Sequence, residues 1–386
     1  MKRAYLLGAG LSLIGSGSVL AGGIERSGQF LGPLFEEGNY LELSYGHVSP
    51  SASGRDQTPF GPGAKTGGIL GTYNSVGLAY KQQFNDQWSA ALIVDQPFGA
   101  DLLYPLGGSA MLGGTSVDVS SVNVTGVVRY EIPDSPFGIH AGIRASRTDG
   151  SVSVGGAAFG PVSGYSMSVD HDTAFGWLAG VSWEKPEIGA RVSLTYNSPI
   201  NHDFRAIERG PLIDPDGPGP APALPLLDGS SPLRVTTPES WNLAFQTGLT
   251  SKTLLFGSIR WVDWSSFRID PERLWQVTGN GLVDLEDSTT YTLGIGHAFN
   301  EKWSGAVSVS YEKAGDDKVS PLSPTNGSKS VTLAAIYTQE RVKVTTAVTY
   351  AALGDAKPSL GTPATAVADL EGSYAWGVGV KVGYSF

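Results

Sequence analysis

Few side chains in this sequence have the types and spacing that catalysis or metal binding requires. The histidines lie far apart and none has a metal-ligand spacing; they are His47, His140, His171, His202 and His297. Only His171 has acidic neighbours, Asp170 and Asp172, and we interpret this cluster as solvated charge near a strand end rather than as a catalytic dyad. The chain contains no cysteine, which excludes a disulfide scaffold, a thiolate metal site and a cysteine nucleophile.

Two short motifs resemble ligand-binding loops only superficially. Residues 61–66 lack the glycine that precedes the lysine of a phosphate-binding loop, and no helix pattern follows them. Residues 214–217 hint at a calcium loop, but prolines stand close by and no glutamate follows at the required offset. The sequence also has no Gly-x-Ser-x-Gly nucleophile elbow. It therefore predicts a protein that is not an enzyme and has no catalytic residues, no metal site and no cofactor.

The composition narrows the class of protein further. The chain has 386 residues with 26 Lys and Arg against 36 Asp and Glu, and this net charge of −10 argues against a nucleic-acid partner. Lys2, Arg3 and the apolar residues 4–19 read as a secretory signal that is cleaved after Ala21. No later apolar run is long enough for a transmembrane helix. An exported soluble β-protein and an outer-membrane β-barrel remain.

Strand-like alternation favours the barrel. From Tyr374 to Phe386 every second residue is aromatic or β-branched, aromatics stand at both ends of this face, and small or polar residues occupy the other face. A lipid-facing strand needs this pattern, because aromatics favour the two headgroup levels and apolar side chains the acyl region. About fourteen such segments follow one another: 40–48, 75–84, 88–98, 117–130, 139–147, 175–183, 192–196, 237–247, 254–267, 291–299, 303–311, 331–337, 342–350 and 374–386.

The connections alternate between short and long, as in outer-membrane barrels with both termini in the periplasm. The short turns are 85–87, 133–136, 185–187, 250–252, 300–302 and 339–341, and the long loops are 49–71, 99–114, 149–165, 205–234, 270–288, 314–328 and 355–370. Residues 211–232 are so rich in proline that we expect an extended surface loop there. We predict an all-β, transmembrane antiparallel barrel of about 14 strands in the bacterial outer membrane, with a signal peptide (1–21), a short luminal segment (22–37) and one barrel domain (38–386).

The strand phase directs several basic side chains toward the barrel lumen: Lys81, Arg129, Arg144, Arg191, Arg260, Lys343 and Lys381. Glu42 is the clearest acid on the same face. Such cations could attract an anionic head group, or they could pair with lumen acids and hold the wall together, which is the commoner use. Both interpretations stay open at this point.

Two neighbouring segments carry a resemblance to a known family. Residues 237–243 (TPESWNL), followed by residues 261–267 (WVDWSSF), resemble the outer-membrane long-chain fatty acid and hydrocarbon transporters of the FadL/TodX type. Residues 175–200 and 96–99 (QPFG) fit the same family, and the resemblance runs in matching order from about residue 38 to 386. It implies a fourteen-stranded barrel that binds amphipathic ligands in its lumen, in agreement with the strand count.

The resemblance also implies a lateral exit into the bilayer at a kinked third strand. Here that strand is 88–98, and Pro97, Phe98 and Gly99 mark the expected break, although Pro97 and Gly99 could instead simply begin the loop. By position, Arg147 and Arg268 resemble residues that hold the ligand carboxylate. Strand phase places Arg268 on the face of Arg260 and Trp264, whereas Arg147 falls on the outward face unless a bulge intervenes.

One departure from the family concerns gating. Family members carry an N-terminal hatch of several tens of residues with an Asn-Pro-Ala-type segment, and that segment is absent here. The short stretch 22–37 contains Ile24, Phe30, Leu31, Leu34 and Phe35, which could form a small apolar plug.

These observations together predict a monomeric, passive outer-membrane channel for hydrophobic compounds, above all long-chain fatty acids. Its binding residues would be Arg268, Arg147, Arg260, Trp264 and Arg144, and its partners the hydrophobic ligand and the surrounding lipid and lipopolysaccharide. A general porin for small polar solutes and an outer-membrane lipase-type enzyme are the alternatives, and a receptor or adhesion role of the loops could coexist with transport.

Overall fold

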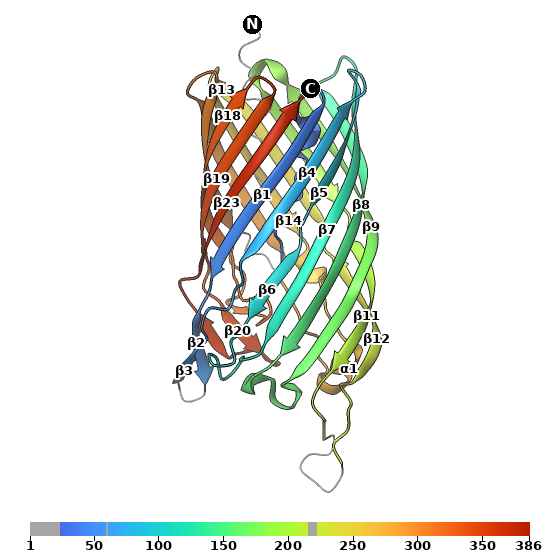
Figure 1. The fold of residues 1–386 in the computed structure, drawn as a ribbon, viewed down its shortest axis with the longest axis vertical. Coiled ribbons are helices and arrows are strands. Elements are labelled where there is room, and N and C mark those ends of the chain that lie inside the picture. The colour runs from blue at the N-terminus through green and yellow to red at the C-terminus, as the bar shows by residue number, and fades with distance from the viewer. Residues whose placement is uncertain (1–23, 59–60, 215–221) are drawn as a thin grey trace.

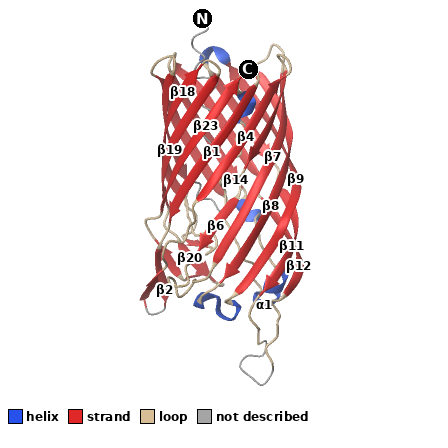
Figure 2. Cartoon of the chain, in the orientation of Figure 1, coloured by secondary structure: helices blue, strands red, loops and turns tan. Residues whose placement is uncertain are grey.

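The computed structural model describes residues 24–58, 61–214 and 222–386. The predicted signal peptide lies outside these described residues. The chain forms one closed barrel of tilted strands, with long loops gathered at the end opposite the C-terminus (Figures 1 and 2). No helix among the described residues is long and apolar enough to cross a membrane.

One sheet of 17 segments builds the barrel, and three pairs of segments are successive parts of one strand (β5 with β6, β10 with β11, β12 with β13), which leaves fourteen strands. The segments are β1 (Tyr40–Ser51), β4 (Tyr73–Gln83), β5 (Trp88–Asp95), β6 (Gly99–Leu103), β7 (Ser116–Glu131), β8 (Phe137–Val154), β9 (Tyr165–Lys185), β10 (Ala190–Asn197), β11 (Ile200–Arg209), β12 (Gly229–Thr237), β13 (Ser240–Thr250), β14 (Thr253–Val262), β15 (Ser288–Ala298), β16 (Trp303–Glu312), β18 (Ser328–Gln339), β19 (Val342–Leu353) and β23 (Tyr374–Ser385). The predicted fold class is confirmed.

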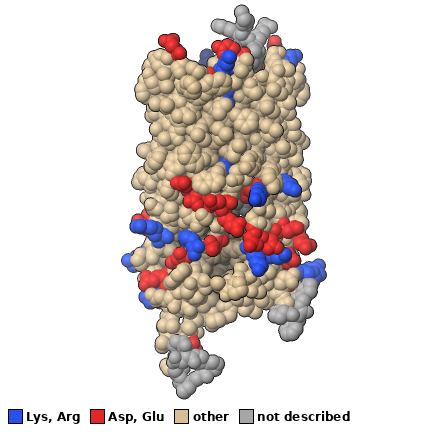
Figure 3. All heavy atoms as spheres, turned by 180° about the vertical axis from the view of Figure 1, so that it is seen from behind, with Lys and Arg blue, Asp and Glu red and all other residues tan. Residues whose placement is uncertain are grey.

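The barrel closes between its first and last strands, since β1 pairs antiparallel with β23 from Tyr40↔Ser385 to Ser51↔Tyr374. Along β23 exposed and buried residues alternate, so that Trp376 is 50% exposed while Ala375 is fully buried. On the face shown in Figure 3 the barrel wall has a broad band with very few charged side chains, and most charges lie below it on the loop side or at the opposite rim. This band is the surface that an apolar bilayer core requires.

The long loops hold more regular structure than the sequence indicated. They contain β2 (Gly54–Thr58), β3 (Gly61–Lys65), β17 (Lys318–Val319), β20 (Lys357–Leu360), β21 (Thr365–Ala366), β22 (Ala368–Leu370), η2 (Ala157–Val162), η4 (Trp264–Ser266) and α1 (Glu272–Thr278). The hairpin of β8 and β9 also runs further than predicted, to Val154 and from Tyr165, because its residues keep alternating between an inner apolar and an outer polar face.

Two boundaries predicted from the sequence are wrong. The predicted loop 205–234 ends earlier, because β12 begins at Gly229. This strand contains Pro232, which lacks a backbone N–H; β12 tolerates it because, among the described strands, it pairs on one side only, with β11. The predicted strand 254–267 stops at Val262. Beyond it Ser265 donates to the carboxylates of Asp263 (2.8 Å) and Asp287 (3.0 Å), and these local bonds replace the strand ladder.

The interior of the barrel is filled rather than open. Toward the end with the short turns, η1 (Gly32–Phe35) brings Leu34 against Ala91 and Leu178 of the wall. Toward the long loops a larger apolar cluster includes Phe98 and Trp264. Buried polar side chains line the wall between the two clusters, and the candidate site lies where this polar zone meets the larger cluster.

Candidate functional site

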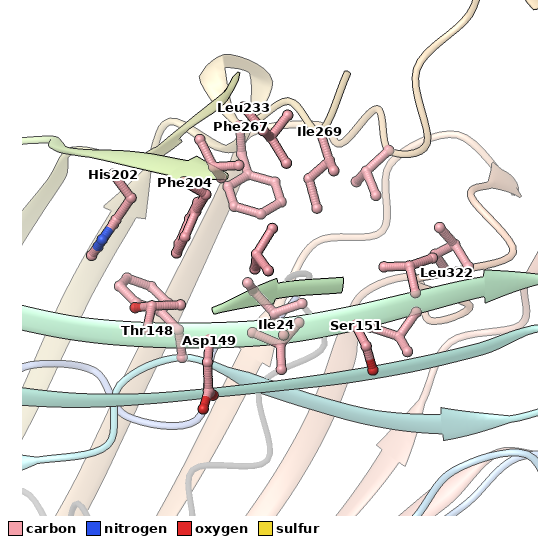
Figure 4. A pocket seen from close by; sticks show the side chains of 18 of the residues that line it. Ile24, Thr148, Asp149, Ser151, His202, Phe204, Leu233, Phe267, Ile269 and Leu322 are labelled. Carbon is pink, nitrogen blue, oxygen red and sulfur yellow. The ribbon is translucent and has the colours of Figure 1, made fainter. Parts of the chain in front are cut away.

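A cavity with an almost entirely apolar lining lies inside the loop end of the barrel (Figure 4). It encloses about 830 Å³ of space between atoms, including the part open to solvent. Its wall comes from five segments whose inward positions are apolar: Val119 of β7, Val152 of β8, Val169 of β9, Phe204 of β11 and Val235 of β12. We call it the first cavity. At this level of the barrel the inward positions of β8 and β9 are apolar and the outward ones polar, because alternate strand residues point to opposite faces.

The connection between β14 and β15 closes one side of the first cavity with Phe267, Ile269, Val283 and Leu285. A buried carboxylate holds this connection in place. Glu208 of β11 accepts the backbone N–H groups of Arg273 (3.2 Å) and Leu274 (3.1 Å) in α1, together with two side-chain hydroxyls from β9 and β12. The cavity wall is therefore tied to the rigid barrel at its loop side.

The third barrel strand is interrupted beside this cavity. β5 ends at Asp95 and the strand resumes as β6 at Gly99, which continues the ladder with β7. The ladder between β4 and β5 stops at the pair Leu78↔Val94. Further along, β6 contacts the chain that precedes β4, where the Gly71 N–H donates to the Asp101 carbonyl (2.9 Å). Between these points residues 73–77 of β4 have no ladder partner on the third strand among the described pairs, and we call this interval the lateral opening.

Residues 24–27, here called the latch, cover the lateral opening from the lumen side. The Gly99 N–H donates to the Ile24 carbonyl (2.8 Å), and the N–H groups of Arg26 (2.7 Å) and Ser27 (3.3 Å) donate to the Pro97 carbonyl. The Ser27 hydroxyl also lies 3.0 Å from a carboxylate oxygen of Asp95. The latch thus pairs like a short added strand with the break between β5 and β6.

A buried ion pair fixes the latch to the opposite wall. Glu25 receives hydrogen bonds from the Arg260 guanidinium, with Nε at 3.0 and 3.2 Å from its two carboxylate oxygens. Arg260 also donates to the Ser240 hydroxyl (3.0 Å) and the Asn242 amide oxygen (2.7 Å). Glu25 is 6% and Arg260 3% exposed. In such surroundings an ion pair that loses one partner leaves an uncompensated charge.

The chain after the latch is held across the lumen by further polar contacts. Arg144 donates to the Gln29 amide oxygen (2.6 Å) and to the Ser198 carbonyl (2.5 Å). The Phe35 ring faces two guanidinium groups, those of Arg129 and Arg191. These contacts anchor the chain that follows the latch independently of the Glu25–Arg260 ion pair.

A second cavity lies between the latch and the lateral opening. It encloses about 670 Å³ of space between atoms, including the part open to solvent, and Arg26, Tyr73, Gly99 and Asp101 are among its lining residues. Ile24 lines both cavities, so the latch separates the apolar chamber from the opening. The two cavities thus lie next to each other, with Ile24, Leu322 and Ser323 in the wall of both.

The residues predicted to bind ligand lie in three different environments. Arg144 and Arg260 face the lumen as predicted, but both are engaged by the protein itself. Trp264 is fully buried in η4, with its ring edge-on to Phe98 at 6.0 Å between centroids. Pro97, Phe98 and Gly99 lie at the strand break, where Phe98 lines the first cavity. The break is not a simple loop start, because β6 continues the strand.

Arg147 and Arg268 lie away from both cavities. Arg147 is exposed on the outward face of β8, and the only register shift of that strand against β9 comes after it, between Thr148 and Gly150. Arg268 lies beyond the end of β14, half-exposed, with its guanidinium 3.2 Å from Asp284. The expectation that it shares a strand face with Arg260 is wrong, because the strand has already ended.

The other lumen-facing cations are engaged by protein groups. Lys343 pairs with Glu36 (3.2 Å), Lys381 with Glu42 (3.4 Å), and Arg129 with two acidic side chains. Lys81 donates to the Glu36 carbonyl at 2.5 Å. The sequence left open whether these cations attract an anionic head group or pair with lumen acids and stabilise the wall. In the structure these four cations contact protein groups and so stabilise the wall. The sequence does not indicate Glu25 or Arg26, because no local pattern reveals contacts with distant residues: Glu25 pairs with Arg260, 235 positions away, and Arg26 packs on Tyr73.

Comparison with known proteins agrees with this geometry. The family model described as "Outer membrane protein transport protein (OMPP1/FadL/TodX)" matches residues 65–386. No curated protein matches the chain. Among solved structures, a Pseudomonas aeruginosa FadL homologue is 17% identical, with 92% of each chain covered and a TM-score of 0.69. The Pseudomonas putida toluene transporter TodX is 14% identical over 91% of this chain and 90% of its own, with a TM-score of 0.60. The Ralstonia pickettii toluene transporter TbuX is 13% identical over 92% of this chain and 90% of its own, with a TM-score of 0.58.

Proposed function

This chain belongs to the OMPP1/FadL/TodX family of outer-membrane transport proteins, which carry hydrophobic compounds, and we propose that it is a passive channel that releases its ligand sideways into the bilayer. The observation that carries the proposal is the pair of cavities on either side of the latch. An apolar solute gains little by entering a watery pore, whereas an apolar chamber beside an interrupted strand lets it pass from the cell surface to lipid without crossing water.

In the proposed route the ligand enters at the loop end and fills the first cavity. Burial against Val119, Val169 and Phe204 supplies the affinity. The ligand then displaces the latch, passes Phe98 and leaves between residues 73–77 and 95–100. Consumption of the ligand inside the cell provides the drive.

We propose long-chain fatty acids as the preferred ligands. The first cavity offers an acyl chain an almost entirely apolar wall, which suits the chain of a fatty acid. Uncharged hydrocarbons fit the same wall and form the alternative. A general porin would need an open polar constriction. Residues 24–37 instead cross the lumen and pack against its wall, which favours a closed lumen.

Uptake by cells that lack their own fatty-acid channel tests this function. With the protein expressed in the outer membrane, we expect radiolabelled oleate to enter several times faster than in cells without it, while a small labelled sugar is excluded. Sugar entry without oleate uptake would contradict the proposal and favour the porin. An esterase assay on the same membranes covers the lipase alternative, and we expect it to show no activity above background.

A further inference from the structure

Arg26 differs from the other basic side chains that face the lumen. Among the described residues its guanidinium has neither a carboxylate within 4.0 Å nor a hydrogen-bond acceptor. Arg129, Arg260, Lys343 and Lys381 each have a carboxylate partner, and the remaining cations, Lys81, Arg144 and Arg191, donate to carbonyl or amide oxygens. The electrostatic influence of Asp101 and Asp118 reaches it only from a greater distance. Arg26 is thus a positive charge that the protein itself does not neutralise by direct contact.

The position of this charge is well defined. The Arg26 guanidinium lies over the Tyr73 ring, 4.4 Å from its centroid, and packs directly against the Cα of Gly99. A Cβ at residue 99 would stand 2.5 Å from the guanidinium carbon. The glycine is therefore needed to make space for the arginine and not to allow an unusual backbone angle. Tyr73 belongs to β4 and Gly99 to β6, and the charge therefore sits at the lateral opening.

The surroundings suit an anionic head group on an apolar chain. Arg26 lines the second cavity, which also has polar lining residues, while the first cavity on the other side of Ile24 is apolar. Arg26 is partly buried, and this burial lowers the pKa of its guanidinium. A guanidinium in such a place binds a carboxylate through two parallel N–H bonds, and more strongly than an exposed one would.

We propose that Arg26 receives the carboxylate of an alkyl acid at the lateral opening and so decides whether the channel prefers acids over uncharged chains of the same length. This inference rests on the proposed function, because it presumes that an acyl chain occupies the first cavity. It places the head-group contact on the latch, not at Arg147 or Arg268.

Ligand binding to the purified, folded protein in a nonionic detergent tests the assignment. Oleate and oleyl alcohol share one chain and differ in charge, and isothermal titration gives a Kd for each. For Arg26→Gln we expect the Kd of oleate to rise about tenfold or more, while that of oleyl alcohol changes less than about twofold. Arg26→Lys should retain most of the oleate affinity, and Arg147→Gln and Arg268→Gln, the matched controls, should behave as the unaltered protein.

The possible outcomes separate the two proposals. Equal losses for oleate and oleyl alcohol in Arg26→Gln, or no loss for either, would overturn the role of Arg26 while leaving the channel function intact. A loss of oleate affinity in Arg147→Gln or Arg268→Gln, with Arg26→Gln unaffected, would move the head-group site to the sequence-predicted position. Failure of the unaltered protein to bind either ligand would overturn the channel function itself. The mobility of unheated protein on a denaturing gel verifies that each barrel is folded.

Discussion

Replacement of Glu25 by glutamine is expected to release the latch and to speed hydrophobic uptake severalfold. The change removes the anion from a buried Arg260 that keeps only its contacts to Ser240 and Asn242. Loss of one partner from a buried ion pair costs about 3–5 kcal/mol, or at least roughly a hundredfold in the equilibrium between held and released latch. Hydrogen exchange of the Arg26 and Ser27 amides, which now donate to Pro97, measures the release.

The control for this variant is Glu131→Gln. Glu131 also pairs with a lumen arginine, Arg129, but it is 43% exposed at the side chain, and Arg129 keeps Glu184 as a second partner. We expect Glu131→Gln to leave both amide exchange and uptake unchanged. Uptake that stays at the original rate in Glu25→Gln, with the latch amides exchanging freely, would show that the latch does not control the route.

A bulky residue inside the first cavity is expected to lower ligand affinity strongly. Val169 of β9 lines the cavity and is only partly buried, so a phenylalanine there projects into the space instead of straining the wall. If the ring displaces roughly 80–100 Å² of ligand contact, the lost burial is about 2 kcal/mol, or roughly thirtyfold in Kd. Titration of Val169→Phe with oleate and with oleyl alcohol should show this loss for both ligands alike.

Val122→Phe provides the matched control. Val122 is on the neighbouring barrel wall in β7 but faces lipid, where it is 41% exposed. The same substitution there adds apolar surface to the lipid face, and we expect the affinity to stay within about twofold of the original. Unchanged binding in Val169→Phe would mean that the ligand does not occupy the first cavity.

Much of the barrel could be predicted from the sequence because its physical cause is local. The alternation along each strand indicates which side chains meet lipid, and the turn lengths indicate which end faces the periplasm. All fourteen strands are therefore predicted, although several extend further toward the long loops than the pattern indicates. Errors came where another interaction overrides the alternation. After Val262 the hydroxyl of Ser265 and its acidic partners end the strand, although the apolar spacing continues through Trp264 and Phe267.

The site could be predicted only in part, because its parts come from distant stretches of chain. Pro97 and Gly99 indicated the strand break through their own backbone chemistry. The engagement of Arg260 by Glu25 depends on a segment that crosses the lumen, and no pattern around either residue reveals it. From the sequence Gly99 only marks the expected break, whereas the structure shows that it also makes room for Arg26.

The most direct test of the proposed route is oleate uptake by a variant whose latch can be locked. Glu25 and Phe98 face each other across the pairing of the latch with the third strand, and the chain has no cysteine of its own, so Glu25→Cys combined with Phe98→Cys introduces the only two thiols. We predict that the oxidised double variant takes up little oleate and that a reductant restores uptake to at least the original rate. Equal uptake before and after reduction, with the disulfide verified by mass spectrometry, would contradict a route that passes the latch.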